Sequence, residues 1–197
     1  MSAMSKGRLE AFSDGVIAVI ITIMVLELKV PHGATLADLV PSLPVFLSYV
    51  LSFAFVGIYW NNHHHMLHAV RKVNGKVLWA NLLLLFWMSL IPFATSWMGE
   101  NEFAVVPVAL YGAVCWLSGL AYYNLSRTLI AAEGEGSALA AAVGQDRKGI
   151  ISLVLYTAGI ALAFLNPLLA LAIYVITALL WFIPDQRIET RVAGAGE

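Results

Sequence analysis

The chain has 197 residues, of which 60% are hydrophobic and 12% are charged, and its formal net charge is −1. A soluble domain of this size cannot bury so much apolar surface, so the composition predicts an integral membrane protein. The nearly neutral charge offers no basic surface for nucleic acid. The single cysteine, Cys115, excludes an internal disulfide and a metal site built from cysteines.

Six apolar segments predict six transmembrane helices, because each approaches the roughly 20 residues that cross the hydrocarbon core of a bilayer. The segments are residues 8–28, 43–67, 76–98, 103–129, 149–165 and 167–183. We therefore expect one all-α transmembrane domain over residues 1–191 and a disordered tail over residues 192–197. Pro92 lies inside the third segment, where it should kink the helix.

The basic residues predict the orientation of these spans. Six crossings put both termini on one side, and that side then holds ten of the eleven Lys and Arg residues, while the other side holds only Lys29. By the positive-inside rule we expect both termini of this multi-pass protein in the cytoplasm.

The first segment is unusual because polar residues occupy its first two turns, and no charge follows Asp14 until Glu27. On a helical wheel a largely apolar stripe falls within about 40° of one line. The stripe consists of Arg8, Phe12, Gly15, Val19, Ile23, Leu26 and Val30. Asp14 lies about 140° from that line, so this helix is expected to present one face and to anchor the other. Thr22, about 60° from the line, either bonds back to its own i−4 carbonyl or faces outward with the stripe.

Polar residues of three helices are expected at the same depth. Asp14 lies about 9 Å inside the cytoplasmic end at 1.5 Å per residue, and Trp60, His63 and Asn81 reach about the same level. Trp60 and His63 are spaced i, i+3, so both are expected to donate to the Asp14 carboxylate or the Ser13 hydroxyl. Such a network either only holds the first helix in place or also transmits gating or pH changes.

The histidine run does not favour a metal site. Consecutive helical residues point about 100° apart, so His63, His64 and His65 do not converge, and only His64 and His68 share a face. No acidic ligand lies nearby in sequence, so we expect a partly solvated cluster, no metal and no cofactor. No nucleophile, acid pair or phosphate loop accompanies these histidines, and we do not expect an enzyme.

Several motifs resemble one known family. Residues 8–14 read R-x-x-x-F-S-D, residues 60–63 read W-x-x-H, and Asn81 and the IPFAT stretch around Pro92 follow in the third segment. This set is similar to the lysosomal and endosomal potassium channel family of transmembrane proteins and its prokaryotic homologues. The likeness covers the first half of the chain closely, and the last three segments match mainly in number and length.

This resemblance implies a potassium-preferring cation channel in the plasma membrane of a prokaryote. Four copies of a six-helix subunit would surround a pore lined by the first helix, so the partners are other copies of the chain, membrane lipid, potassium and other monovalent cations. The constriction positions would be Val19, Ile23 and Leu26, with Thr22 as the pore-facing hydroxyl. Because Val19 is small, Ile23 or Leu26 is the better candidate for a seal that gates by dewetting. Arg8, Phe12, Ser13, Asp14, Trp60, His63 and Asn81 would brace the pore helix.

One alternative remains open. Asp14 and the membrane histidines would also suit the proton relay of a proton-coupled secondary transporter. Two features weigh against this hypothesis, because the chain has no visible inverted repeat and Asp14 faces away from the stripe.

Overall fold

The computed structural model describes residues 5–134, 136–144 and 146–182. Within these ranges it consists of helices and loops, with no strand. The helices are α1 (Lys6–Leu26), the 3-10 helix η1 (Leu36–Ser42), α2 (Leu43–His68), α3 (Gly75–Met88), α4 (Ile91–Glu100), α5 (Val105–Glu133), α6 (Ala138–Val143), α7 (Arg147–Ala163) and α8 (Pro167–Phe182). The all-α class expected from composition is therefore confirmed for the described part of the chain. The expected tail over residues 192–197 lies outside the described residues.

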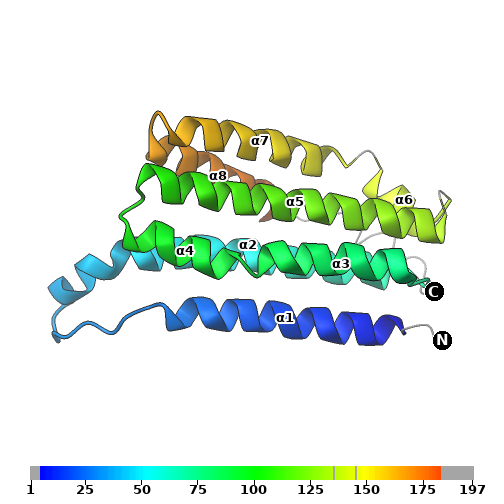
Figure 1. Cartoon of the computed structure of the whole chain (residues 1–197), viewed down its shortest axis with the longest axis horizontal. Coiled ribbons are helices and arrows are strands. Elements are labelled where there is room, and N and C mark those ends of the chain that lie inside the picture. Colours follow the sequence, from blue (N-terminus) through cyan, green and yellow to red (C-terminus); the bar gives the residue numbers. More distant parts are fainter. Residues whose placement is uncertain (1–4, 135, 145, 183–197) are drawn as a thin grey trace.

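Four stretches of the described chain are long and apolar enough to cross a membrane: Lys6–Leu26, Leu36–His68, Gly75–Glu100 and Val105–Glu133. They correspond to the first four predicted spans. The last two predicted spans are the helices α7 and α8, with 17 and 16 residues, and both are shorter than the ~20 residues that a perpendicular crossing needs. They run back to back as a hairpin (Figure 1).

The third predicted span is broken where the proline was expected to disturb it. Helix α3 ends at Met88 and α4 begins at Ile91, so Pro92 takes a position in the first turn of α4. Proline is tolerated there because the first turn of a helix needs no backbone N–H from it. The N–H groups of Ser89 and Leu90 bond instead to the carbonyls of Leu85 and Trp87, at 2.9 and 3.2 Å. The predicted kink is confirmed as a break between α3 and α4.

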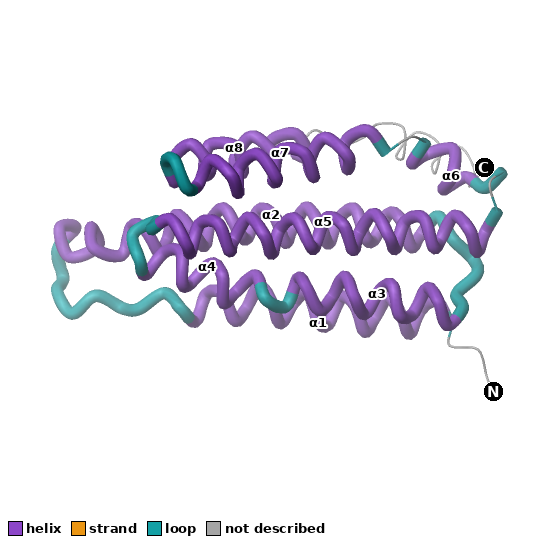
Figure 2. The backbone as a smooth tube through the Cα atoms, turned by 45° about the horizontal axis from the view of Figure 1, so that its top comes forward, coloured by secondary structure: helices purple, strands orange, loops and turns teal. Residues whose placement is uncertain are grey.

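Helix α5 is the central packing element. It contacts α3 and α4 on one side and α7 and α8 on the other. Figure 2 shows the α7 and α8 hairpin above α2 and α5, with α1, α3 and α4 below them. Helix α1 packs mainly on α2 and also touches α3 and α4, so it lies at the edge of the bundle.

A glycine of α7 leaves room for an aromatic ring of α8. The ring of Tyr174 is fully buried, and its hydroxyl donates to the Val108 carbonyl at 3.4 Å. A Cβ added to Gly159 of α7 would lie 2.5 Å from the Cε1 atom of Tyr174. Glycine at this position therefore leaves the space that the tyrosine ring fills.

The antiparallel helices gather the basic residues at one end of the bundle. The end where α1 begins (Figure 1) carries Lys6, Arg8, Arg71, Lys72, Lys76, Arg127, Arg147 and Lys148. Arg187 and Arg191 lie outside the described residues. At this end the carboxylate of Glu133, the last residue of α5, accepts hydrogen bonds from the backbone N–H groups of Arg71 and Lys72 in the loop between α2 and α3. We call it the basic end, and the end that holds Lys29 the opposite end.

Replacing Gly159 with alanine is expected to destabilise the subunit by about 1–3 kcal/mol, because the new methyl group overpacks against Tyr174. The measurement is the thermal unfolding midpoint of the detergent-purified protein. Gly119→Ala is the matched control, since its Cβ would meet no atom nearer than 3.5 Å. An unchanged midpoint in Gly159→Ala would contradict the described packing of α7 on α8.

Candidate functional site

Helix α1 has one face packed on the bundle and one face without a partner in the subunit. Its buried residues are Leu9, Ser13, Ile17, Ile20 and Met24, which recur at the three- and four-residue spacing of a single helix face. Each of these helical turns therefore directs one side chain to the bundle of α2, α3 and α4, and all of these side chains except Ser13 are apolar. Ser13 is the exception, since it is polar and fully buried.

The residues of the predicted stripe lie on the unpartnered face. Side-chain exposure is 50% for Phe12, 53% for Val19, 43% for Ile23 and 78% for Leu26. The helix ends at Leu26, two residues before the predicted boundary, and Val30 lies beyond it in the following loop. The stripe therefore ends at Leu26 as a helical feature.

Thr22 is exposed on the same side, and its hydroxyl donates to the Val19 carbonyl at 3.0 Å. The back-bonding expected from the sequence is present, although it reaches the i−3 carbonyl and not the i−4 carbonyl. A hydroxyl that donates to its own helix keeps its oxygen lone pairs available outward. The two interpretations of Thr22 are therefore compatible.

Two separate hydrogen-bonded connections hold Ser13 and Asp14 of α1 on the neighbouring helices. In the first, the indole Nε1 of Trp60 on α2 donates to Oδ1 of Asp14 at 3.0 Å. This is one of the contacts expected from the sequence. Both residues are exposed in the isolated subunit, so this bond lies at the edge of the buried face that is turned away from the stripe.

The second connection is a buried chain across three helices. Ser13 donates to the Leu9 carbonyl at 2.9 Å and accepts from Nδ2 of Asn81 on α3 at 2.9 Å. Oδ1 of Asn81 lies 2.8 Å from Nε2 of His63 on α2. Ser13, His63 and Asn81 are at most 1% exposed, so their polar atoms find their partners in one another.

The expected role of His63 as a direct donor to Asp14 or Ser13 is wrong. Asn81 lies between the histidine and the serine, because the amide can accept with one end and donate with the other. Arg8 and Phe12 do not join the network either. Arg8 is exposed and has no side-chain hydrogen bond or ion pair with another described residue, and Phe12 lies on the stripe.

The remaining histidines form a ladder of rings on α2. The His64 ring stacks on Trp60 at 6.0 Å and on His68 at 6.2 Å between ring centroids. Within the described residues no group of three or more His, Cys, Asp or Glu side chains is placed to hold a metal ion. Lys6 of α1 donates to the His68 carbonyl at 3.1 Å and fixes the start of α1 on the end of α2.

An open groove runs along the stripe between α1 and α4. Its lining includes Phe12, Val19, Ile23 and Glu27 from α1 and the following residue, with Phe93 and Ser96 from α4. Ser96 donates to Oε2 of Glu27 at 3.1 Å. No interval in the sequence points to this bond, because it joins the residue after α1 to a residue of α4, 69 positions away.

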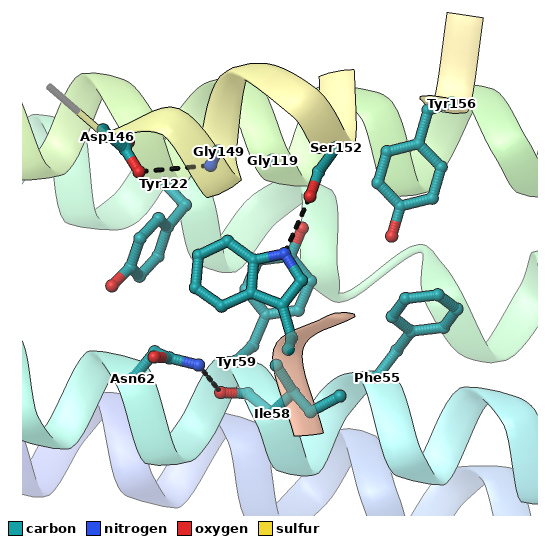
Figure 3. Close-up of a pocket in the computed structure, with 11 residues that line it drawn as sticks. Phe55, Ile58, Tyr59, Asn62, Gly119, Tyr122, Asp146, Gly149, Ser152 and Tyr156 are labelled. Atoms are coloured by element: carbon teal, nitrogen blue, oxygen red, sulfur yellow. Dashed lines mark hydrogen bonds between the residues drawn. The ribbon is translucent and has the colours of Figure 1, made fainter. Parts of the chain in front are cut away.

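A second cavity lies far from the stripe, between α2, α5, α7 and α8 (Figure 3). Aromatic side chains of Phe55, Tyr59, Tyr122, Tyr156 and Trp181 line it, and the Trp181 indole donates to Ser152 at 2.8 Å. Its volume of about 40 Å³ accommodates about two or three water molecules and no organic ligand. This cavity therefore does not compete with α1 as the functional site.

Comparison with known proteins connects this arrangement to one family. A family model described as "Endosomal/lysosomal potassium channel TMEM175" matches residues 8–92, the stretch from the start of α1 to the start of α4 that holds all members of the polar network. A potassium channel from Chryseobacterium sp. is 56% identical over 94% of this chain and 97% of its own length. A potassium channel from Streptomyces collinus is 33% identical over 96% of this chain and 98% of its own.

A solved structure gives the same result for the fold. The crystal structure of a lysosomal potassium-selective channel TMEM175 homolog from Chamaesiphon minutus matches with a TM-score of 0.78 and 26% identity. The match covers 91% of this chain and 97% of that one. The resemblance expected from the sequence motifs is confirmed, and the chain belongs to the TMEM175 potassium channel family.

Proposed function

We propose that this protein is a potassium-preferring cation channel, in which four identical subunits place their α1 helices around a central pore. Membership of the family makes the chain a channel protein and not an enzyme. Full-length relatives named as potassium channels support passive potassium conduction across the membrane.

The observation that carries the proposal is the division of α1 into two faces. Ser13 and Asp14 are bonded to α2 and α3, so the rotation of the helix about its axis is fixed. With that rotation Val19, Ile23 and Leu26 project away from the subunit. Four such faces around an axis would form hydrophobic rings that seal the pore by dewetting. Thr22 would add a ring of hydroxyl oxygens that replaces part of the hydration shell of an ion.

The same proposal covers topology and location. Six spans per subunit require α7 and α8 to cross the membrane as a pair of short helices. Tilting would shorten their reach further, whereas local thinning of the bilayer would match their length. The gathering of basic residues at one end supports cytoplasmic termini in a prokaryotic plasma membrane. We treat residues 1–191 as one channel domain that is embedded in lipid, binds other copies of itself, and needs no cofactor beyond its permeant ions.

Ile23→Ala is expected to raise potassium flux severalfold and to reduce the preference for potassium over sodium, because a smaller ring is easier to wet. The measurement is ion flux in proteoliposomes under a potassium gradient and then a sodium gradient. Val25→Ala is the matched control, since Val25 is 44% exposed but lies about 120° from the stripe. Equal fluxes in the wild type and in Ile23→Ala, Leu26→Ala and Val19→Ala would exclude a pore lined by this stripe.

Asn81→Ala is expected to destabilise the subunit by about 1–3 kcal/mol, because the buried hydroxyl of Ser13 and the ring of His63 both lose a partner. Thermal unfolding in detergent measures the loss, and ion flux in the surviving protein tests whether the stripe is still held in place. Asn62→Ala serves as the control, because the Asn62 amide bonds only to the Ile58 carbonyl of its own helix. Equal losses in the two variants would show that the chain from Ser13 to His63 is not what fixes α1.

A further inference from the structure

The opposite end of the bundle differs in charge from the basic end. Its described loops and helix ends carry Glu27, Asp38, Glu100 and Glu102, and Lys29 is the only Lys or Arg among residues 27–42 and 99–104. A cation that enters the proposed pore from this end therefore meets several carboxylates and one ammonium group per subunit.

Lys29 does not face the carboxylates as a free charge. Its Nζ donates to Oε1 of Glu100 at 2.6 Å, across 71 positions of the sequence. The hydrogen bond and charge of Glu100, together with the charge of Glu27, raise the pKa of Lys29. The pair of Lys29 and Glu100 is therefore neutral as a unit, and the charges of Glu27, Asp38 and Glu102 remain at this end.

Glu27 occupies a different place at the same end. It follows Leu26, the last helical residue of the stripe, and it lines the groove that also holds Val19 and Ile23. The Ser96 hydroxyl binds its Oε2 atom, which holds the carboxylate beside the end of the stripe. Glu27 is therefore the acidic residue that the fold places next to the proposed constriction.

We infer that Glu27 determines cation entry at this mouth of the pore, and that Glu100 protects this role by neutralising Lys29. The inference rests on the proposed function, because it needs the stripe of α1 to line a pore. Rings of carboxylates at a channel mouth raise the local concentration of cations, and a ring of unpaired ammonium groups lowers it.

The exposure of the ion pair favours a role in conduction over a role in stability. The side chains of Lys29 and Glu100 are 80% and 43% exposed, and exposed pairs add little to the stability of a fold. Their charges still contribute to the field at the mouth. That field is screened over about 10 Å at 0.1 M salt and over about 3 Å at 1 M, so its effect on conduction must depend on ionic strength.

The test compares single-channel potassium currents in planar bilayers at low and high salt. Glu100→Gln leaves Lys29 charged and unpaired, so current entering from the opposite end should fall by about twofold or more at 20 mM salt and change little at 1 M. Current entering from the basic end should change less. Glu27→Gln should give the same salt-dependent loss. The double variant Lys29→Gln/Glu100→Gln should recover wild-type current, because it removes both charges.

The control is Glu102→Gln, which removes a carboxylate from the same end without releasing a lysine. A loss in Glu100→Gln that persists at 1 M salt, or that the double variant does not reverse, would overturn the inference. So would an unchanged current in Glu27→Gln at low salt. A failure of the proposed function would look different, since the wild type would then carry no potassium current or Ile23→Ala would leave that current unchanged.

Discussion

The arrangement of this subunit depends on the cost of leaving a polar group unpaired in an apolar interior. Ser13 is fully buried among three helices, and its hydroxyl bonds both to its own helix and to Asn81. Asn81 in turn satisfies His63, so no member of the chain can rotate away without leaving another unpaired. The network therefore fixes one angle, the rotation of α1 about its own axis.

That angle decides which face of α1 is available to line the proposed pore. A rotation of α1 by one residue, about 100°, would turn the stripe onto the bundle and expose Ile17 and Ile20 in its place. Apolar packing alone does not prevent this, because isoleucine and valine are nearly interchangeable as surfaces against other helices. The hydrogen bond from Trp60 to Asp14 attaches the same turn of α1 at a second residue. With Ser13 and Asp14 both attached, the orientation of α1 about its axis is defined.

The sequence was sufficient for features that depend on local spacing. The two faces of α1, the break near Pro92 and the pairing of Asp14 with Trp60 follow from helical periodicity, proline chemistry and matched depth in the membrane. Sequence spacing did not identify the hydrogen-bond partner where several polar side chains lie at the same depth in the bundle. The choice of Asn81 by His63, and of Glu27 by Ser96, depends on distances between helices that no sequence interval encodes. The same holds for the Glu133 carboxylate, which caps the loop between α2 and α3 from the end of α5.

The charge distribution links insertion to conduction. Membrane insertion favours Lys and Arg on the cytoplasmic side, and in the described part of the chain eight of these residues lie at the basic end while Lys29 alone lies at the opposite end. That bias leaves the other side poor in cationic groups, which is also what the mouth of a cation pore requires. Lys29 is the exception, and it is the residue whose ammonium group is paired with a carboxylate at 2.6 Å. The ammonium group of Lys29 would repel cations at the proposed pore mouth if it were unpaired. Its pairing with Glu100 removes that repulsion.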